Sequence, residues 1–170
     1  MSPRSLKNKY RINTLNIKHL VAIVFSLCLF SCSQKKEDIF YLKNKNGKGF
    51  TITEQTNSET ITNTFGTPLS VEHESKTDAE GLPSWTNIKY SGLTLELVGT
   101  SIDGVTITGD NWSIGGITIG TDAEFINDNF KLLKKEGNYL LYQVPDFDGV
   151  LFVKLNTGSK VIECGLSNPS

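Results

Sequence analysis

Hydrophobic and polar residues alternate in short runs along the second and third thirds of the chain. Runs of this kind, rich in β-branched and aromatic residues, are typical of half-buried strands. Turn dipeptides such as Ser91-Gly92 and Asp148-Gly149 separate them. Because the connections are too short for crossovers, we expect antiparallel pairing. The predicted strands cover residues 69–74, 86–90, 93–98, 105–108, 139–144, 150–155 and 160–164.

Two segments of the chain match without a gap. Residues 56–65 align with 121–130, and Thr, Glu, Ile and Phe coincide at the same places. Thr-x-x-Glu is a capping box that begins a helix, and Ile and Phe four residues apart share one helical face. The first helix is expected to end before Gly66, and the second to continue through residues 131–135 to Gly137.

The sequence therefore predicts an α+β fold made of two repeats, at about residues 50–110 and 115–166. Each repeat is a short helix followed by an antiparallel meander. Helices with one apolar stripe should pack on one face of the sheet. The other face would then be free to bind a partner.

The amino-terminal region has a different pattern. An apolar run over residues 20–30 follows five basic residues, and no acidic residue precedes Glu37. The run is too short for a spanning helix, which needs roughly 20 apolar residues. A basic leader, a short apolar core and a small residue before polar sequence are typical of a secretory signal. We predict a signal peptide over residues 1–31.

The end of this run, Leu29-Phe30-Ser31-Cys32, resembles a bacterial lipobox. The resemblance implies diacylglyceryl transfer to the Cys32 thiol, cleavage between Ser31 and Cys32, and acylation of the new amine by a fatty acid such as palmitate. Two or more acyl chains anchor a protein stably. Residues 32–38 would then be a tether. The alternative is an ordinary or uncleaved signal with a chance cysteine.

The residues after Cys32 indicate where the anchor would lie. The position that would hold aspartate for inner-membrane retention is Ser33, so the sorting rule implies the outer membrane. Residues 34–38 also resemble the signal that exports some lipoproteins to the cell surface. A charged run of this kind is equally a solvated linker. Cell surface and periplasmic leaflet therefore stay open.

The net charge of the chain after the leader limits the kinds of partner it can bind, and its length indicates the number of domains. Five of the 17 basic side chains lie in the leader, which leaves 12 against 18 acidic ones and a net charge of −6. Phosphate binding needs a basic face, so nucleic acid is excluded as a partner. The membrane link would be the lipid alone. Residues 39–168 suit one domain, in which Cys164 has no cysteine partner and is expected in the core.

Residues that carry chemistry are few. His73 is the one histidine after the leader and is expected to face solvent on a strand. The chain has neither a Gly-x-Ser-x-Gly nucleophile motif nor a phosphate-binding loop. Asp146-Phe147-Asp148-Gly149 lacks the closing glutamate of a calcium loop. We expect no enzymatic activity, cofactor or metal site.

Aromatic residues near turns and on strands are the candidates for a binding face, because Tyr and Trp are enriched at interface hot spots. Each of them could equally fill the core. The candidates are Trp85, Tyr90, Trp112, Tyr139, Tyr142 and Phe147.

The motif Phe65-Gly66-Thr67-Pro68 at a helix end, followed by aromatic-containing strands in tandem, resembles the fold shared by the β-lactamase inhibitor protein and the SmpA/OmlA outer-membrane assembly lipoproteins. The second copy lacks the motif and has Phe130-Lys131-Leu132-Leu133. The resemblance implies a protein-binding module without chemistry. It does not identify β-lactamase or the assembly machinery as the partner, because fold does not fix function.

The function expected from the sequence is therefore a non-enzymatic, lipid-anchored binding protein of the outer membrane with an unknown protein partner. The alternatives are a periplasmic scaffold or assembly factor for outer-membrane complexes, and a small hydrolase.

Overall fold

The computed structural model describes residues 37–53, 56–74 and 84–168. Residues Lys36–Ser170 form one compact unit. The predicted signal peptide, Ser31, Cys32 and most of the predicted tether lie outside the described residues, so those boundaries stay predictions. The elements are β1 (Tyr41–Asn44), β2 (Gly49–Thr51), α2 (Ser58–Phe65), β3 (Ser70–Glu74), β4 (Trp85–Tyr90), β5 (Leu93–Val98), β6 (Ser101–Ile107), β7 (Trp112–Ile114), β8 (Ile117–Thr118), α3 (Ala123–Asn129), β9 (Lys131–Glu136), β10 (Tyr139–Gln143), β11 (Val150–Leu155) and β12 (Val161–Ser167).

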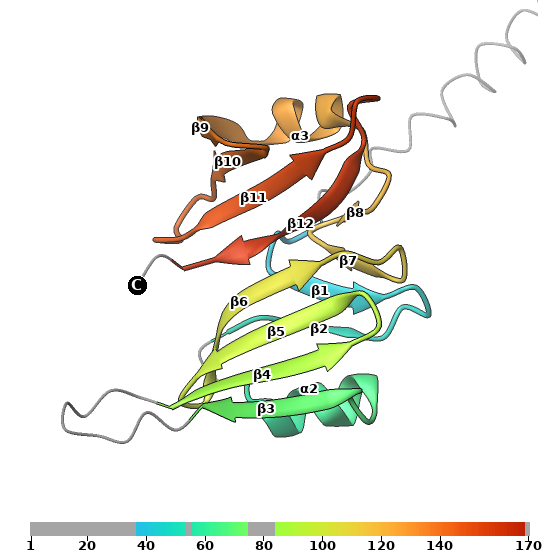
Figure 1. Cartoon of the computed structure of the whole chain (residues 1–170), viewed down its shortest axis with the longest axis vertical. Helices are drawn as coiled ribbons and strands as arrows, with labels where there is room; N and C mark the ends of the chain where they lie inside the picture. Colours follow the sequence, from blue (N-terminus) through green and yellow to red (C-terminus); the bar gives the residue numbers. More distant parts are fainter. Residues whose placement is uncertain (1–36, 54–55, 75–83, 169–170) are drawn as a thin grey trace, which may run out of the picture. The chain divides into compact units, whose positions relative to one another are not determined.

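The described strands form two antiparallel sheets. The large sheet has eight strands in the order β3-β4-β5-β6-β12-β11-β10-β9 (Figure 1). It consists of two four-stranded meanders that join where β6 pairs with β12. The small sheet has the order β2-β1-β7-β8 and receives one hairpin from each half of the chain. In each sheet, the strands from the first half of the chain and those from the second half therefore follow the same order from the edge to the middle.

The fold is mostly β, so the predicted α+β arrangement with helices covering the sheet is wrong. Helices α2 and α3 are 8 and 7 residues long, and the buried residues in them are Ile61 and Ile126. Helices that bury so little apolar surface cannot cover an eight-stranded sheet. The second layer is the small sheet, whose central strands bury Leu42 and Ile114 completely.

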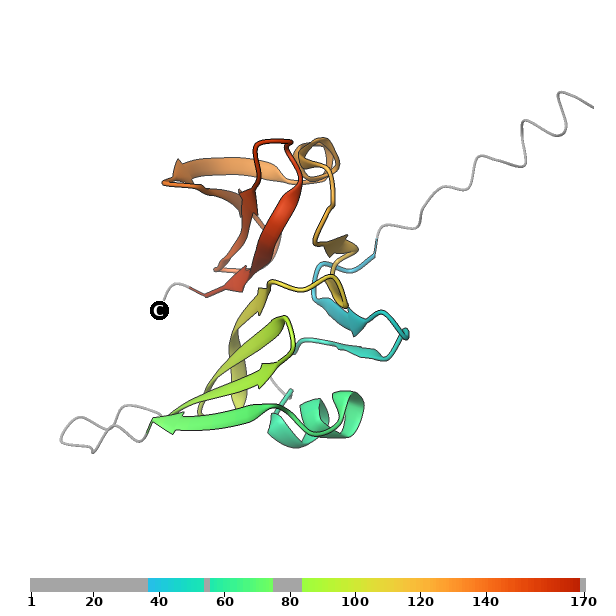
Figure 2. The same ribbon diagram turned by 45° about the vertical axis from the view of Figure 1, so that its right-hand side comes forward.

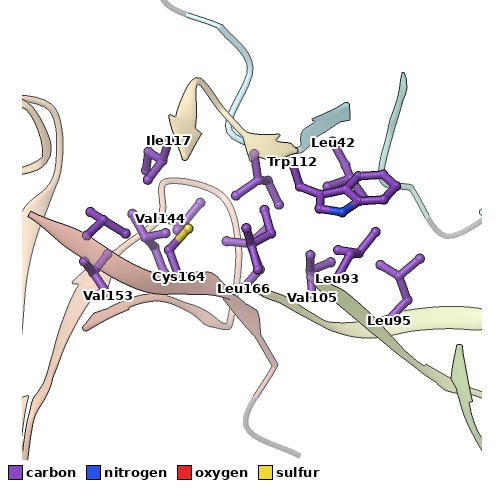
Figure 3. Close-up of a cluster of buried hydrophobic side chains, with 14 of the residues drawn as sticks. Leu42, Leu93, Leu95, Val105, Trp112, Ile117, Val144, Val153, Cys164 and Leu166 are labelled. Carbon is purple, nitrogen blue, oxygen red and sulfur yellow. The ribbon is translucent and has the colours of Figure 1, made fainter. Parts of the chain in front are cut away.

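The hydrophobic core lies between the two sheets. In Figure 3, Leu42 and Trp112 from the small sheet lie over Leu93, Val105 and Leu166 of the large sheet. Strand β5 shows why these residues meet, because its burial alternates strictly from Leu93 to Val98. Burial of a leucine or valine side chain stabilises the fold by about 1.5–3 kcal/mol.

The predicted extension of the second helix through residues 131–135 is also wrong. Helix α3 ends at Asn129, and Phe130 is extended, with φ −132° and ψ 144°. The next six residues form β9, which pairs with β10. Lys, Leu and Glu favour helix, but this preference is a weak prior. Burial of Phe130 in the core and the backbone pairing with β10 overcome it.

The matching threonines of the two repeats have one role, but it is not the predicted capping box. Thr56 Oγ1 accepts a hydrogen bond from the Thr53 amide at 2.9 Å, and Thr121 Oγ1 accepts one from the Thr118 amide at 3.1 Å. The later threonine amide donates back to the earlier carbonyl in both copies. The residue after each threonine, Asn57 or Asp122, is the N-cap of the helix. In the first helix, Asn57 Oδ1 accepts a hydrogen bond from the Thr60 amide. The threonines therefore close a turn before each helix.

The prediction that Cys164 lies in the core is confirmed, because its side chain is fully buried. Burial, and secondarily the charge of Glu163, raise the pKa of the Cys164 thiol to about 12. The thiol therefore stays protonated and unreactive near neutral pH.

We expect the free energy of unfolding to fall as pH rises from about 9 toward about 12. The unfolded thiol ionises near its ordinary pKa of 9.0, whereas the folded thiol keeps its proton to about 12, so alkali favours the unfolded chain. The slope from this group approaches about 1.4 kcal/mol per pH unit. Burial also raises the pKa of Tyr90 and Tyr142, which act in the same direction. The free energy of unfolding, measured by urea denaturation at several pH values in this range, should fall less steeply with pH for Cys164→Ala than for the unchanged chain. An identical dependence on pH would contradict the prediction.

Candidate binding face

The large sheet has one open face. In Figure 2 the small sheet and both helices lie to the right of the large sheet, and no described helix or strand covers its left side. Strand β11 shows the division, because Leu151 and Val153 are buried whereas Val150, Phe152 and Lys154 are half-buried on the opposite face. Neighbouring strands add further half-buried side chains to the open face: Trp85, Asn87, Lys89, Thr94, Glu96, Val98, Thr106, Tyr139 and Leu141.

Four side chains of β10, β11 and β12 form a cluster on this face. The rings of Tyr139 and Phe152 meet edge to face, with centroids 6.1 Å apart. Tyr139 Oη donates a 3.0 Å hydrogen bond to Glu163 Oε1. Lys154 Nζ lies 3.5 Å from Glu163 Oε2 and 5.2 Å from the centre of the Tyr139 ring. These contacts hold the cluster in one arrangement, which lowers the entropy cost of binding a partner.

Gly165 lies beneath Phe152. A Cβ atom at Gly165 would overlap the carbonyl oxygen of Val105 and lie 2.7 Å from Phe152 Cζ. Gly104 on β6 has a similar role, because its missing side chain leaves room for Glu96, whose Oε2 would lie 3.0 Å from an added Cβ. At both glycines a neighbouring side chain, the Phe152 ring or the Glu96 carboxylate, occupies the space that a side chain would fill.

The other end of the open face holds Trp85. This residue begins β4 and is opposite Val98 on β5 and Glu74 on β3. Lys89 on the same strand forms a 2.8 Å ion pair with Glu72. Aromatic rings therefore lie on both halves of the face, with small and polar residues between them.

Of the six aromatic residues predicted as a binding face, the open face holds Trp85 and Tyr139. Tyr90 and Trp112 belong to a different cluster, in which the Trp112 ring lies 4.9 Å from Phe65 and 5.7 Å from Tyr90. This cluster connects α2 with the small sheet. Trp112 is 8% exposed, so its ring belongs to the core.

The last two predicted residues lie elsewhere again. Tyr142 is fully buried, and its hydroxyl donates a 2.8 Å hydrogen bond to Asn127 Oδ1. Phe147 meets Phe40 edge to face at 5.4 Å and lines a cavity of about 340 Å³ beside Ile102. The six aromatic residues do not share one surface.

Phe152 is absent from the predicted set although its ring belongs to the cluster on the open face. The signal that could have found it is its position between Leu151 and Val153, since alternate residues of a strand face opposite sides. Apart from Lys154, both sets in β11 are apolar. The alternation alone therefore gives only a weak sign of which set faces the core.

The prediction that His73 faces solvent is confirmed. Its side chain is exposed, and its Nδ1 lies 3.0 Å from Thr86 Oγ1. Within the described ranges, no three His, Cys, Asp or Glu side chains gather closely enough to hold a metal ion. No helix in the part of the chain that the structure describes has the length and hydrophobicity to cross a membrane.

Comparisons with known proteins add little to this description. No known family matches the sequence, and no curated protein matches it. A crystal structure at 1.5 Å of an extracellular protein containing an SCP domain, from Bacillus anthracis str. Ames, is similar in part, with 14% identity and a TM-score of 0.46. The similarity covers 66% of this chain and 43% of that one, so this chain spans less than half of that protein. A likeness at this level carries no argument about function.

Proposed function

We propose that this chain is a non-enzymatic, lipid-anchored protein of the bacterial cell envelope that binds another protein through the open face of its large sheet. The observation that carries the proposal is the set of half-buried aromatic rings on that face, Trp85, Tyr139 and Phe152. Aromatic residues held in a fixed arrangement supply much of the energy at protein interfaces. The polar middle of the face would form the hydrogen bonds that set specificity.

The amino-terminal sequence supports the anchor. The basic leader, the short apolar run and the lipobox-like residues before Cys32 fit lipidation at that thiol. The acidic charge of the rest of the chain favours a partner with a basic surface, because complementary charge speeds encounter. Mass spectrometry of the amino-terminal peptide tests the anchor, and protease treatment of intact cells separates surface display from the alternative of a periplasmic scaffold.

The binding face is tested by substituting one ring at a time. Phe152→Ser should lower capture of the partner from detergent-solubilised envelopes about 30-fold, the effect of losing about 2 kcal/mol at a hot spot. Quantitative mass spectrometry of proteins captured by the full-length chain gives the measurement. Phe125→Ser is the matched control, because Phe125 is a 38% exposed ring on α3, away from the open face. Equal losses in the two variants would argue against the open face.

A further inference from the structure

The large sheet ends in two exposed strands. β3 is one edge and β9 is the other, and all six residues of β9 are exposed. Both edges carry exposed apolar side chains, with Leu132 48% and Leu133 50% exposed on β9, and Val71 45% exposed on β3. An edge strand presents unpaired amide and carbonyl groups that another strand can bind.

The two edges have opposite charge on the same face of the sheet. On the open face β3 places Glu72 and Glu74, because these residues are opposite Asn87 and Trp85 in the register. On that face β9 places Lys131, Lys134 and Glu136, by their register with Gln143, Leu141 and Tyr139.

The opposite side of the sheet is also complementary at the edges. Val71 of β3 is opposite the core residue Ile88, and Leu132 of β9 is opposite the core residue Tyr142. The apolar side chain of each edge strand therefore projects to the side of the sheet that holds the core. If the two edges met, leucine would lie beside valine on one side and lysine beside glutamate on the other.

The number of strands sets the direction of such a pairing. Every neighbouring pair in the large sheet is antiparallel, and the sheet has eight strands, so β3 and β9 run in opposite directions. A second copy placed beside the first in the same orientation would bring its β3 antiparallel to β9. Antiparallel pairing is the more stable kind and would continue the open face from one copy to the next.

We propose that copies of this chain associate head to tail, with β9 of one copy paired antiparallel to β3 of the next. The two pairings between identical edges are less favoured, because β3 beside β3 apposes two acidic edges and β9 beside β9 apposes two edges that each carry three lysines and one glutamate. A head-to-tail contact leaves a free edge at each end, so it builds a row or a closed ring of copies.

The existing ion pairs of these residues do not prevent the contact. Glu72 pairs with Lys89 at 2.8 Å and Lys134 with Glu136 at 3.2 Å. Side chains in both pairs are 43–67% exposed, and exposed pairs of this kind contribute little. They can exchange partners when a neighbouring copy arrives.

The test uses two charge-reversed forms of the full-length chain in detergent, studied by sedimentation velocity. The first form carries Lys131→Glu and Lys134→Glu, and the second carries Glu72→Lys and Glu74→Lys. Each form alone has like charges on both edges, so its self-association should be about tenfold weaker than that of the unchanged chain. An equal mixture of the two should restore association, because each β9 then meets a β3 of opposite charge.

Salt and folding controls make the result decisive. Association of the unchanged chain should weaken when salt is raised from about 50 mM to about 0.5 M, since exposed charges are screened. Circular dichroism should show that both reversed forms keep the β fold. The proposal is overturned if the unchanged chain stays a single copy at all concentrations, if reversal of one edge has no effect, or if the mixture fails to recover association. Because this contact uses the sheet edges, it is independent of whether the open face binds a partner.

Discussion

Replacing Trp112 with alanine is expected to lower the free energy of unfolding by about 3–5 kcal/mol. The ring is 8% exposed and contacts Phe65 and Tyr90 at centroid distances of 4.9 and 5.7 Å. Its Nε1 donates a 2.7 Å hydrogen bond to the carbonyl of Ser91, at the turn between β4 and β5. The side chain thus joins the small sheet, α2 and the large sheet, and its removal leaves a cavity where all three meet.

Urea denaturation of a form that begins at Ser33 measures the loss. Trp112→Phe keeps a ring and loses the hydrogen bond, so it should cost less than Trp112→Ala, with about 1 kcal/mol from the missing bond. Trp85→Ala is the matched control, since Trp85 is half-buried on the open face and outside the core. A loss below about 1 kcal/mol for Trp112→Ala would show that this cluster does not hold the two sheets together.

Replacing Gly165 with alanine is expected to cost about 3 kcal/mol, at the upper end of the effect of overpacking. The new methyl group would overlap the carbonyl oxygen of Val105, and backbone atoms cannot move aside as a flexible side chain can. Gly165 lies where β12 pairs with β6, at the one junction between the two meanders in the large sheet. Strain there acts on both halves of the sheet.

Gly158→Ala is the control for the change from glycine to alanine. Gly158 lies in the turn before β12, and an added Cβ would meet Asn156 Oδ1 at 3.4 Å, which is ordinary contact. Thermal unfolding should therefore change little for Gly158→Ala. Phe152→Ala combined with Gly165→Ala should recover only part of the loss, because the overlap with Val105 remains. Full recovery would place the strain in the ring and not in the backbone.

The strands of the two meanders could largely be predicted from the sequence. Alternation and turn dipeptides predicted residues 86–90 and 150–155, which correspond to β4 and β11. Strands β1 and β7 were missed because they have four and three residues, too few to show a period. Strand β9 was predicted as helix because its residues favour helix locally, and the pairing with β10 that decides the matter is not local.

The candidate site was only partly predictable for a related reason. The sequence shows which residues of a strand share a face, but the side that faces the core depends on where the second layer lies. Trp85 and Tyr139 were selected as aromatic residues near turns and lie on the open face, whereas Tyr142 was selected by the same criterion and is buried. Once the small sheet is placed, every residue of the large sheet has its side assigned.

The pairing of β6 with β12 has a consequence for how such a chain could arise. A polypeptide with only one half would expose β6 as an unpaired edge whose residues Val105 and Ile107 are buried in the present fold. Such a half could bury them by pairing β6 with the β6 of an identical molecule, which would give an eight-stranded sheet with the same strand order. A symmetric dimer of this kind, later fused by gene duplication, would account for the threonine turns that recur 65 positions apart.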